Sequence, residues 1–228
     1  MGFLDIFYPK RCLVCGKPGA GSGSVGTIEY ICLKCVDKVE FVGDDICTKC
    51  AKPECRCRKR NFYFDCAIAP FVYTGAISDS VVRLKEYSDF STAQGFAHYM
   101  AVMLKKLVDT SEIDVIVPVP AHISRKSKKG YNQSEIIARY LSKLTGIPFD
   151  KKILKKIKPT MPQRNLNGEA RRHNLTGSFA ASEKAARGKN IILADDVITT
   201  GETLNCCAQE LKRAGAGRIY CIAAVTTK

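Results

Sequence analysis

Two adjacent carboxylates and a short run of hydroxyl residues are the side chains in this chain best suited to chemistry. Asp195 and Asp196 directly follow an apolar run at 191–194, which predicts a buried strand. A loop of Thr and Gly comes next, and a helical pattern begins at 202. The amides and hydroxyls of such a loop, at the positive end of a helix, suit a phosphate. Because carboxylates accept hydrogen bonds from sugar hydroxyls or hold hydrated Mg²⁺, the stretch predicts a sugar-phosphate site.

Residues 190–203 resemble, without a gap, the 5-phosphoribosyl 1-diphosphate (PRPP) binding loop of the type I phosphoribosyltransferases. The resemblance implies that Asp195 and Asp196 bind the ribose hydroxyls. The residues that it implies for the 5′-phosphate are Thr199, Thr200, Gly201 and Thr203. The alternative is an ordinary strand-to-helix turn whose Asp and Thr side chains cap the helix. Capping needs one such residue rather than five in order, which favours the ligand site.

Eight of the 12 cysteines lie within residues 12–57, in close pairs whose spacing suits metal coordination. The pairs are Cys12 and Cys15, Cys32 and Cys35, Cys47 and Cys50, and Cys55 and Cys57. The first two pairs have CxxC spacing and a separation typical of a four-cysteine zinc site, so they predict one structural zinc. The last pair is CxC, so one or two zinc ions, and crossed pairing of the four pairs, are all compatible with the sequence.

Disulfides and a redox CxxC are the alternatives for these cysteines. The first residues lack the long apolar core of a secretory signal, and a PRPP site implies a cytosolic substrate. We therefore expect reduced thiols and a cytoplasmic protein, with the inner face of the membrane as a second possible location. No stretch approaches the roughly 20 apolar residues that a transmembrane helix needs, so no transmembrane segment is expected.

The positive charge is concentrated in one part of the chain. The net charge is +14, and residues 121–175 carry 14 Lys or Arg against 3 Asp or Glu. A pyrophosphate pocket, a nucleic-acid surface and a solvated basic face are all compatible with this excess. Aromatic residues near these cations, such as Tyr131 and Tyr140, are few, so the sequence does not favour a strong base-stacking surface.

Apolar runs that alternate with helical patterns predict an α/β fold with a mostly parallel sheet flanked by helices. We expect strands within 61–73 and at 113–119, 153–157, 179–181, 191–194 and 219–225. We expect helices at 75–85, 91–108, 133–144 and 202–214. The predicted domains are a zinc-binding cysteine-rich module at 1–60 and a phosphoribosyltransferase-like domain at 61–228. Ligands of such sheets bind beyond the carboxyl ends of the strands.

Two further loops contribute to the expected site. The first follows a predicted strand and is dense in cations and amides, which suits a pyrophosphate, although it is equally compatible with a solvated surface loop. The second, at 159–175, is long enough to be a lid or a disordered insertion. The expected pyrophosphate-binding residues are Lys85, Pro118, Val119, Pro120 and Lys129. The expected lid residues are Gln163, Arg164, Arg171 and Asn174.

The order of these motifs resembles the ComF family of competence-related, phosphoribosyltransferase-like proteins over nearly the whole chain. The motifs are Tyr8-Pro9 before the cysteines, Tyr73, Gly75 and Lys85, Val117–Pro120 with Lys129–Gln133, Gln163 and Leu166 with Arg171 and Asn174, and the PRPP loop. Two features depart from the family pattern. Lys129 stands where Arg is usual, which keeps the charge but not a bidentate grip, and the second cysteine set is extra.

The resemblance implies Mg²⁺-dependent phosphoribosyl transfer from PRPP, with a part in natural competence and DNA uptake. Asp195, Asp196 and Lys129 would be the catalytic residues. The first alternative is a competence factor that binds single-stranded DNA and uses PRPP as a regulatory ligand. The second is a phosphoribosyltransferase of nucleobase salvage. The partners expected are PRPP, single-stranded DNA and other competence proteins.

Overall fold

A computed structural model describes residues 10–18, 29–43, 46–52, 55, 57, 61–87, 89–121, 130–159, 175 and 177–228. The expected pyrophosphate residue Lys129 lies outside the described residues. So do the expected lid residues Gln163, Arg164, Arg171 and Asn174.

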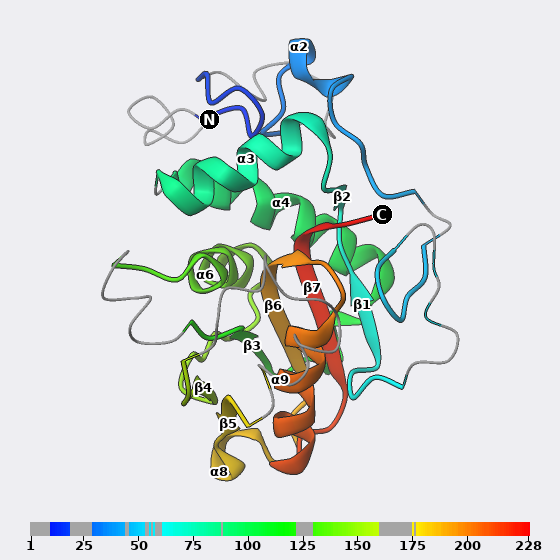
Figure 1. Cartoon of the computed structure of the whole chain (residues 1–228), viewed down its shortest axis with the longest axis vertical. Helices are drawn as coiled ribbons and strands as arrows, with labels where there is room; N and C mark the ends of the chain where they lie inside the picture. The colour runs from blue at the N-terminus through cyan, green and yellow to red at the C-terminus, as the bar shows by residue number, and fades with distance from the viewer. Residues whose placement is uncertain are drawn as a thin grey trace.

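The centre of the molecule is a parallel sheet with the strand order β1-β7-β6-β3 and with β2 also paired to β7 (Figure 1). Its strands are β1 (Cys66–Ile68), β2 (Phe71–Val72), β3 (Val115–Pro118), β6 (Ile191–Ile198) and β7 (Ile219–Thr226). A separate antiparallel pair consists of β4 (Leu154–Lys156) and β5 (Phe179–Ala181). The predicted α/β class with a mostly parallel sheet is therefore confirmed.

Helices cover both faces of this sheet. The helices of the described residues are α2 (Leu33–Val36), α3 (Gly75–Glu86), α4 (Phe90–Leu107), the 3-10 turn η1 (Thr110–Glu112), α6 (Gln133–Thr145), α8 (Glu183–Ala186) and α9 (Glu202–Arg213). Side chains alternate along a strand, so Ile192 and Ala194 of β6 join one core with α3, α4 and α6. Ile191 and Leu193 join a second core with α9. The sheet thus lies between two helical layers.

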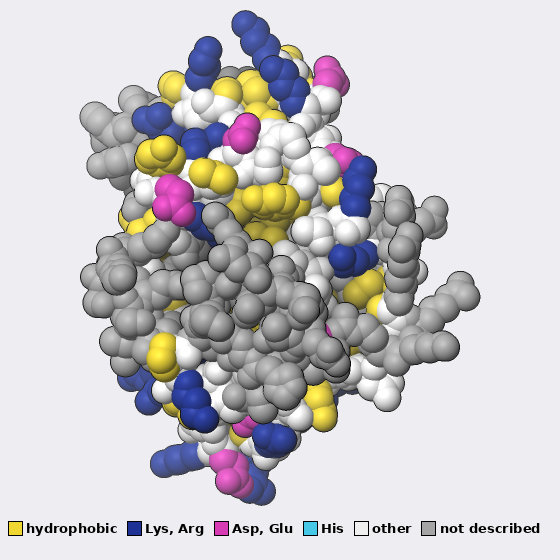
Figure 2. All heavy atoms as spheres, viewed as in Figure 1, with side chains coloured by type: hydrophobic (Ala, Val, Ile, Leu, Met, Phe, Trp, Pro, Cys, Tyr) yellow, Lys and Arg dark blue, Asp and Glu magenta, His cyan; other side chains and the backbone are white. Residues whose placement is uncertain are grey.

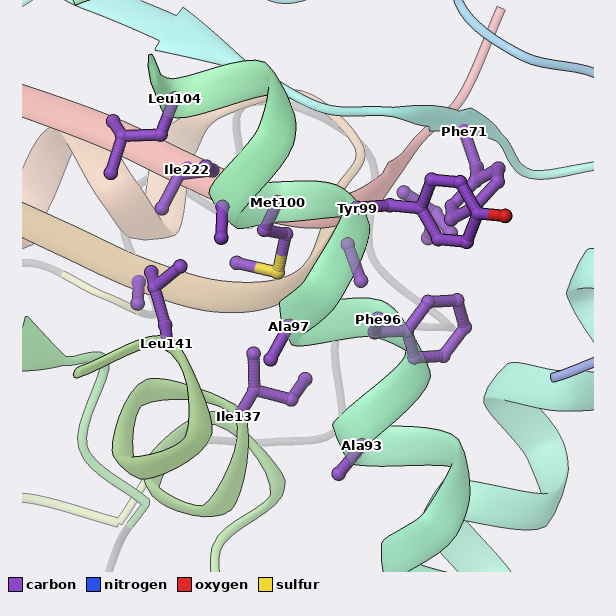
Figure 3. Close-up of a cluster of buried hydrophobic side chains, with 14 of the residues drawn as sticks. Phe71, Ala93, Phe96, Ala97, Tyr99, Met100, Leu104, Ile137, Leu141 and Ile222 are labelled. Atoms are coloured by element: carbon purple, nitrogen blue, oxygen red, sulfur yellow. The ribbon is translucent and has the colours of Figure 1, made fainter. Parts of the chain in front are cut away.

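The larger core forms where α4 crosses α6. Ile137 and Leu141 of α6 point toward Ala97 and Met100 of α4, and all four are fully buried (Figure 3). The side chain of Asp89 caps the start of α4. It accepts hydrogen bonds from the backbone N–H groups of Ser91 and Thr92, which is a normal N-cap arrangement. This packing holds α6 in place, and Ser134 at the start of α6 contacts the candidate site described below.

The cysteine-rich N-terminal segment packs against both cores. Leu13 and Ile31 are buried with α3 and α4, whereas Ala51 is buried in the core on the α9 side. A Cβ added to Gly95 of α4 would lie 3.3 Å from the Cβ of Leu13, so only glycine fits easily at this crossing. The domain boundary at 60 and 61 stays a prediction.

The last half of β6 differs from the expectation. The sequence predicts a strand that ends at Ala194, but β6 continues to Ile198 and includes Asp195 and Asp196. The reason is its partner on one side: β7 continues to pair with it as far as the Ile198–Thr226 register. Polar residues extend the strand here because tertiary pairing overrides their weak strand propensity.

Candidate functional site

The candidate site lies at the carboxyl end of β6, where only one neighbouring strand continues. Pairing between β3 and β6 ends at Pro118 and Ala194, while pairing with β7 goes on. Within the part of the chain that the structure describes, no strand pairs with β6 on the β3 side beyond this point. In open parallel sheets, ligands bind at the carboxyl ends of the strands.

Asp195 is buried and held in place by two donors. Its side chain is 8% exposed, and its Oδ1 accepts from Ser134 Oγ at 2.7 Å and from the backbone N–H of Asp196 at 2.9 Å. Burial and the neighbouring charge of Asp196 raise the pKa of Asp195 to about 7, although the Ser134 bond opposes the shift. Its surroundings therefore favour the protonated form more than water does.

Asp196 is partly buried and faces a lysine from another element. Its Oδ2 lies 3.1 Å from Nζ of Lys85, in the last turn of α3. Burial lowers the pKa of Lys85, but the charges of Asp196 and then Asp195 raise it by more, so it stays above the ordinary value. Lys85, an expected pyrophosphate residue, thus pairs with Asp196 and offsets part of the charge of the acidic pair.

The expected phosphate loop runs from the end of β6 into α9. Gly201 directly precedes α9 with φ of 76°, a conformation that glycine adopts without strain. Oγ1 of Thr200 accepts from the N–H of Glu202 at 3.5 Å, and the carbonyl of Thr199 accepts from Oγ1 of Thr227 at 3.3 Å. The loop therefore places small side chains at the positive end of a helix of 12 residues.

The residues at the end of β3 and just after it have few donors to offer an anion. Pro118 and Pro120 have no backbone N–H, and the N–H of Val119 donates to the carbonyl of Ala194 at 2.8 Å. The carbonyl of Val119 accepts from Asn132 Nδ2 at 2.9 Å. Pro118, Val119 and Pro120 therefore have no backbone N–H group left to bind a pyrophosphate, and their role there would be to position the segments beside them. Their predicted role, like that of Lys129, stays a prediction.

The eight N-terminal cysteines form two groups of four. Within each group the sulfur atoms lie within 4.8 Å of one another. The groups are Cys12, Cys15, Cys32 and Cys35, and Cys47, Cys50, Cys55 and Cys57. Sulfur pairs at 3.9 Å in the first group and 3.6 Å in the second match the edge of about 3.8 Å expected for tetrahedral Zn–S bonds. Both groups fit structural zinc, and the pairing follows chain order rather than crossing.

The ionisation of the second group also favours a cation. The backbone N–H of Cys57 donates to the sulfur of Cys55 and lowers the pKa of Cys55 to about 6. Burial and the neighbouring sulfurs raise the pKa of Cys57 to about 11. Four thiolates so close together can all ionise only if a metal ion offsets their charge, as zinc does.

Sequence reasoning missed three residues that support the site. Ser134 lies at the start of α6, Thr227 lies just after β7, and Lys52 lies inside the second cysteine group. Lys52 Nζ donates to Oγ1 of Thr227 at 3.1 Å, and Thr227 in turn holds the loop. Their distance along the chain from the PRPP-like loop hid them, and no local motif marks them.

Two family descriptions match this chain. "Double zinc ribbon domain" matches residues 3–67, and "Phosphoribosyl transferase domain" matches residues 88–228. The first agrees with the two cysteine groups. The second covers β3, β6 and β7 of the sheet, together with α6 and the acidic pair. Among the described residues, no helix has both the length and the apolar character to cross a membrane.

Relatives of nearly the same length are named for competence and for DNA utilization. The chain is 28% identical to "Competence protein F" of Haemophilus influenzae, covering 93% of this chain and 95% of that protein. It is 26% identical to "DNA utilization protein YhgH" of Salmonella typhimurium, covering 95% and 98%. It is 24% identical to "Competence protein ComFC" of Bacillus subtilis, covering 82% and 80%. The resemblance to the ComF family is thus confirmed.

Solved structures of phosphoribosyltransferases are also similar. An adenine phosphoribosyltransferase matches with a TM-score of 0.39 and 18% identity, over 63% of this chain and 84% of that one. A glutamine PRPP amidotransferase of B. subtilis matches with a TM-score of 0.37 and 21% identity, over 57% of this chain and 26% of that one.

Proposed function

We propose, because this chain belongs to the phosphoribosyl transferase domain family, that it binds PRPP with Mg²⁺ and transfers the phosphoribosyl group. The observation that carries the proposal is an acidic pair beside a loop suited to a phosphate, both at one end of β6. The names of the relatives favour DNA uptake or DNA use as the setting.

Asp195 and Asp196 would accept hydrogen bonds from the two ribose hydroxyls. Both carboxylates must be ionised for this, and the nearby ammonium of Lys85 favours the charged form. The 5′-phosphate would rest on the loop amides of 199–203 at the start of α9, where the helix dipole favours negative charge.

Transfer would break the bond between the anomeric carbon and pyrophosphate as a nitrogen nucleophile or water attacks that carbon. The protein contributes orientation and charge neutralisation rather than covalent chemistry. Bound Mg²⁺ would neutralise charge on the pyrophosphate as it leaves. Lys85, which pairs with Asp196, is one cation that we propose would contact the departing anion, and Lys129 is the second.

A binding function without turnover is the second candidate. Here PRPP would be a regulatory ligand of a protein that handles single-stranded DNA in the cytoplasm, with other competence proteins as partners. The relatives named for DNA utilisation support this candidate, and the net charge of +14 agrees with it. Figure 2 shows Lys and Arg side chains at the upper and lower ends of one face of the molecule. Nucleobase salvage has no specific support in the site.

Calorimetry of PRPP with and without Mg²⁺ tests the pocket. Wild type should bind, and Asp196→Asn should weaken binding about tenfold or more, because a charge-assisted hydrogen bond is lost. Asp79→Asn, an exposed carboxylate on α3, is the matched control and should bind as wild type does. Equal binding by Asp196→Asn would contradict the assignment of the ribose site.

Pyrophosphate release from PRPP separates transfer from binding. The assay pairs PRPP and Mg²⁺ with a panel of nucleobases, amines and single-stranded oligonucleotides. Release that needs one acceptor and is lost in Asp196→Asn supports an enzyme. PRPP binding without release on any acceptor, water included, supports the regulatory candidate.

A further inference from the structure

A groove with aromatic walls and basic edges lies along the outer face of α6, separate from the acidic pair. Its volume is about 460 Å³, within the range of small-ligand sites. The residues that line it are Phe90, Ile136, Arg139, Tyr140, Ser142, Lys143 and Phe149. Three of them are aromatic, and they come from α4, from α6 and from the segment after α6.

The groove keeps its aromatic surface partly open to solvent. Phe90, the first residue of α4, is 46% exposed although it is a large apolar side chain. The ring of Tyr131 meets it edge to face, with 5.7 Å between ring centroids. The hydroxyl of Tyr131 donates to the carbonyls of Leu84 and Lys85 at 3.1 and 3.2 Å. Phe90 is thus held beside a fixed neighbour, so little side-chain entropy is lost when a flat ligand stacks on it.

Cations lie over or beside these rings. The guanidinium of Arg139 is 4.7 Å from the centroid of Phe149, and Nζ of Lys143 is 5.8 Å from that of Tyr140. An adjacent acid, Glu135, is 13% exposed and paired with Arg139 at 2.9 Å and with Lys151 at 2.8 Å. The charged residues that line the groove itself are the two cations Arg139 and Lys143, and they make its edge positive.

The two properties together select the class of ligand. Flat apolar walls favour a planar, polarizable group, and positive edges favour an anion. Bases stack on aromatic side chains without regard to sequence, while phosphates are held by nearby Lys and Arg. An acidic peptide would satisfy the cations but would leave the aromatic surface without a planar partner.

We propose that this groove binds single-stranded nucleic acid, with a base stacked among Phe90, Tyr140 and Phe149. The backbone phosphates lie against Arg139 and Lys143. From the sequence, aromatic residues near the cations, such as Tyr131 and Tyr140, are few, and a strong stacking surface is not expected. The fold brings Phe90 of α4 and Phe149 after α6 beside Tyr140, so the groove exists only in the folded chain. The proposal does not depend on PRPP binding.

Fluorescence anisotropy with labelled oligo(dT) and oligo(U) of 20 nucleotides tests this groove, over a series of salt concentrations. Tyr140→Ala should weaken binding about tenfold with the salt dependence unchanged, because stacking is lost but no phosphate contact is. Tyr140→Phe keeps the ring and should bind as wild type does. Phe90→Ala, at an exposed position less critical for folding, should also weaken binding.

Charge and position have their own controls. Lys143→Gln should weaken binding and reduce the salt dependence, whereas Lys105→Gln, in the last turn of α4, makes the same change elsewhere and should have a smaller effect. Tyr63→Ala removes an aromatic ring that is also 46% exposed but lies before β1, and it should leave affinity unchanged.

The outcomes separate the sources of the ligand and can overturn the proposal. Preference for oligo(dT), preference for oligo(U) or equal binding identifies DNA, RNA or both as the ligand. Unchanged affinity in both Tyr140→Ala and Phe90→Ala overturns it. The proposal is also overturned if a duplex or a single nucleotide binds as tightly as the single-stranded oligonucleotides, or if polyglutamate competes with them equally well. Asp196→Asn should bind the oligonucleotides as wild type does, so failure of the PRPP site would not be mistaken for failure of the groove.

Discussion

Nζ of Lys52 lies 3.1 Å from the hydroxyl oxygen of Thr227, and this contact joins the second cysteine group to the phosphate loop. Lys52 stands between Cys50 and Cys55, and Thr227 donates onward to the carbonyl of Thr199. The N–H of Thr227 also donates to the carbonyl of Ile198 at 3.0 Å. The second cysteine group and the candidate phosphate site are therefore joined by one short hydrogen-bonded path.

Lys52→Met should weaken the binding of ribose 5-phosphate. With the ammonium gone, Thr227 loses a charged donor and the loop is held less firmly. A hydrogen bond of this kind contributes about 1 kcal/mol, which corresponds to roughly a fivefold change in affinity measured by calorimetry. Lys49→Met removes an exposed lysine from the same knuckle and should have no effect. Equal affinity in the two variants would show that the path carries no binding energy.

Gly201→Ala should destabilise the protein and weaken phosphate binding. A Cβ at this position would lie 3.7 Å from Phe62, so there is room for it, and the cost arises from the positive φ. That conformation costs an L-residue about 1 kcal/mol, and relief of the strain would reorient the loop amides. Urea unfolding should show the loss. Gly43→Ala, where φ is not positive and no atom lies near, is the control and should retain full stability.

Asp195→Asn should remove part of the pH dependence of stability. The ordinary pKa of the carboxyl is 3.8 and its folded value is about 7, so the native state holds a proton that the unfolded chain releases. This contribution is fully present below about pH 3.8 and is lost as the pH rises through 7. Wild type should thus lose up to about 1.4 kcal/mol per pH unit in this window from this group, and the variant should not.

Urea unfolding of both proteins without ligand, at pH 5.5, 6.5 and 7.5, measures this difference. Asparagine can still accept from Ser134 and from the N–H of Asp196, so the variant isolates the charge. The variant should become more stable relative to wild type as the pH rises. A difference that is constant with pH would mean that Asp195 ionises normally.

Removal of one cysteine from either group should remove one zinc. Wild type should contain two zinc ions per chain, and Cys35→Ser or Cys57→Ser should contain one. Both variants should unfold at lower temperature, because zinc binding stabilises the folded module. Cys206→Ser, on α9 and outside both groups, should keep both metals. Elemental analysis of the purified proteins decides, and two zinc ions in either group variant would disprove that group.

Local order in the chain was enough to predict the acidic pair, the hydroxyl loop and the helix after it. These residues are neighbours in sequence, and the ligand chemistry needs them as neighbours, so the motif is readable without a fold. The cysteine pairs were readable for the same reason. The extent of β6 was not, because it depends on how far β7 continues as its partner.

The sequence by itself determined the α/β class, the phosphoribosyltransferase-like loop and the presence of thiol pairs. Only the tertiary structure decided which pairs share a metal, that Lys85 faces Asp196, and that Ser134 holds Asp195. It also decided that Phe90 and Phe149 complete a groove on α6. The physical reason is the same in each case. Burial, charge pairing and stacking depend on distances in space, and the packing of whole elements sets these distances between residues that are separated along the chain.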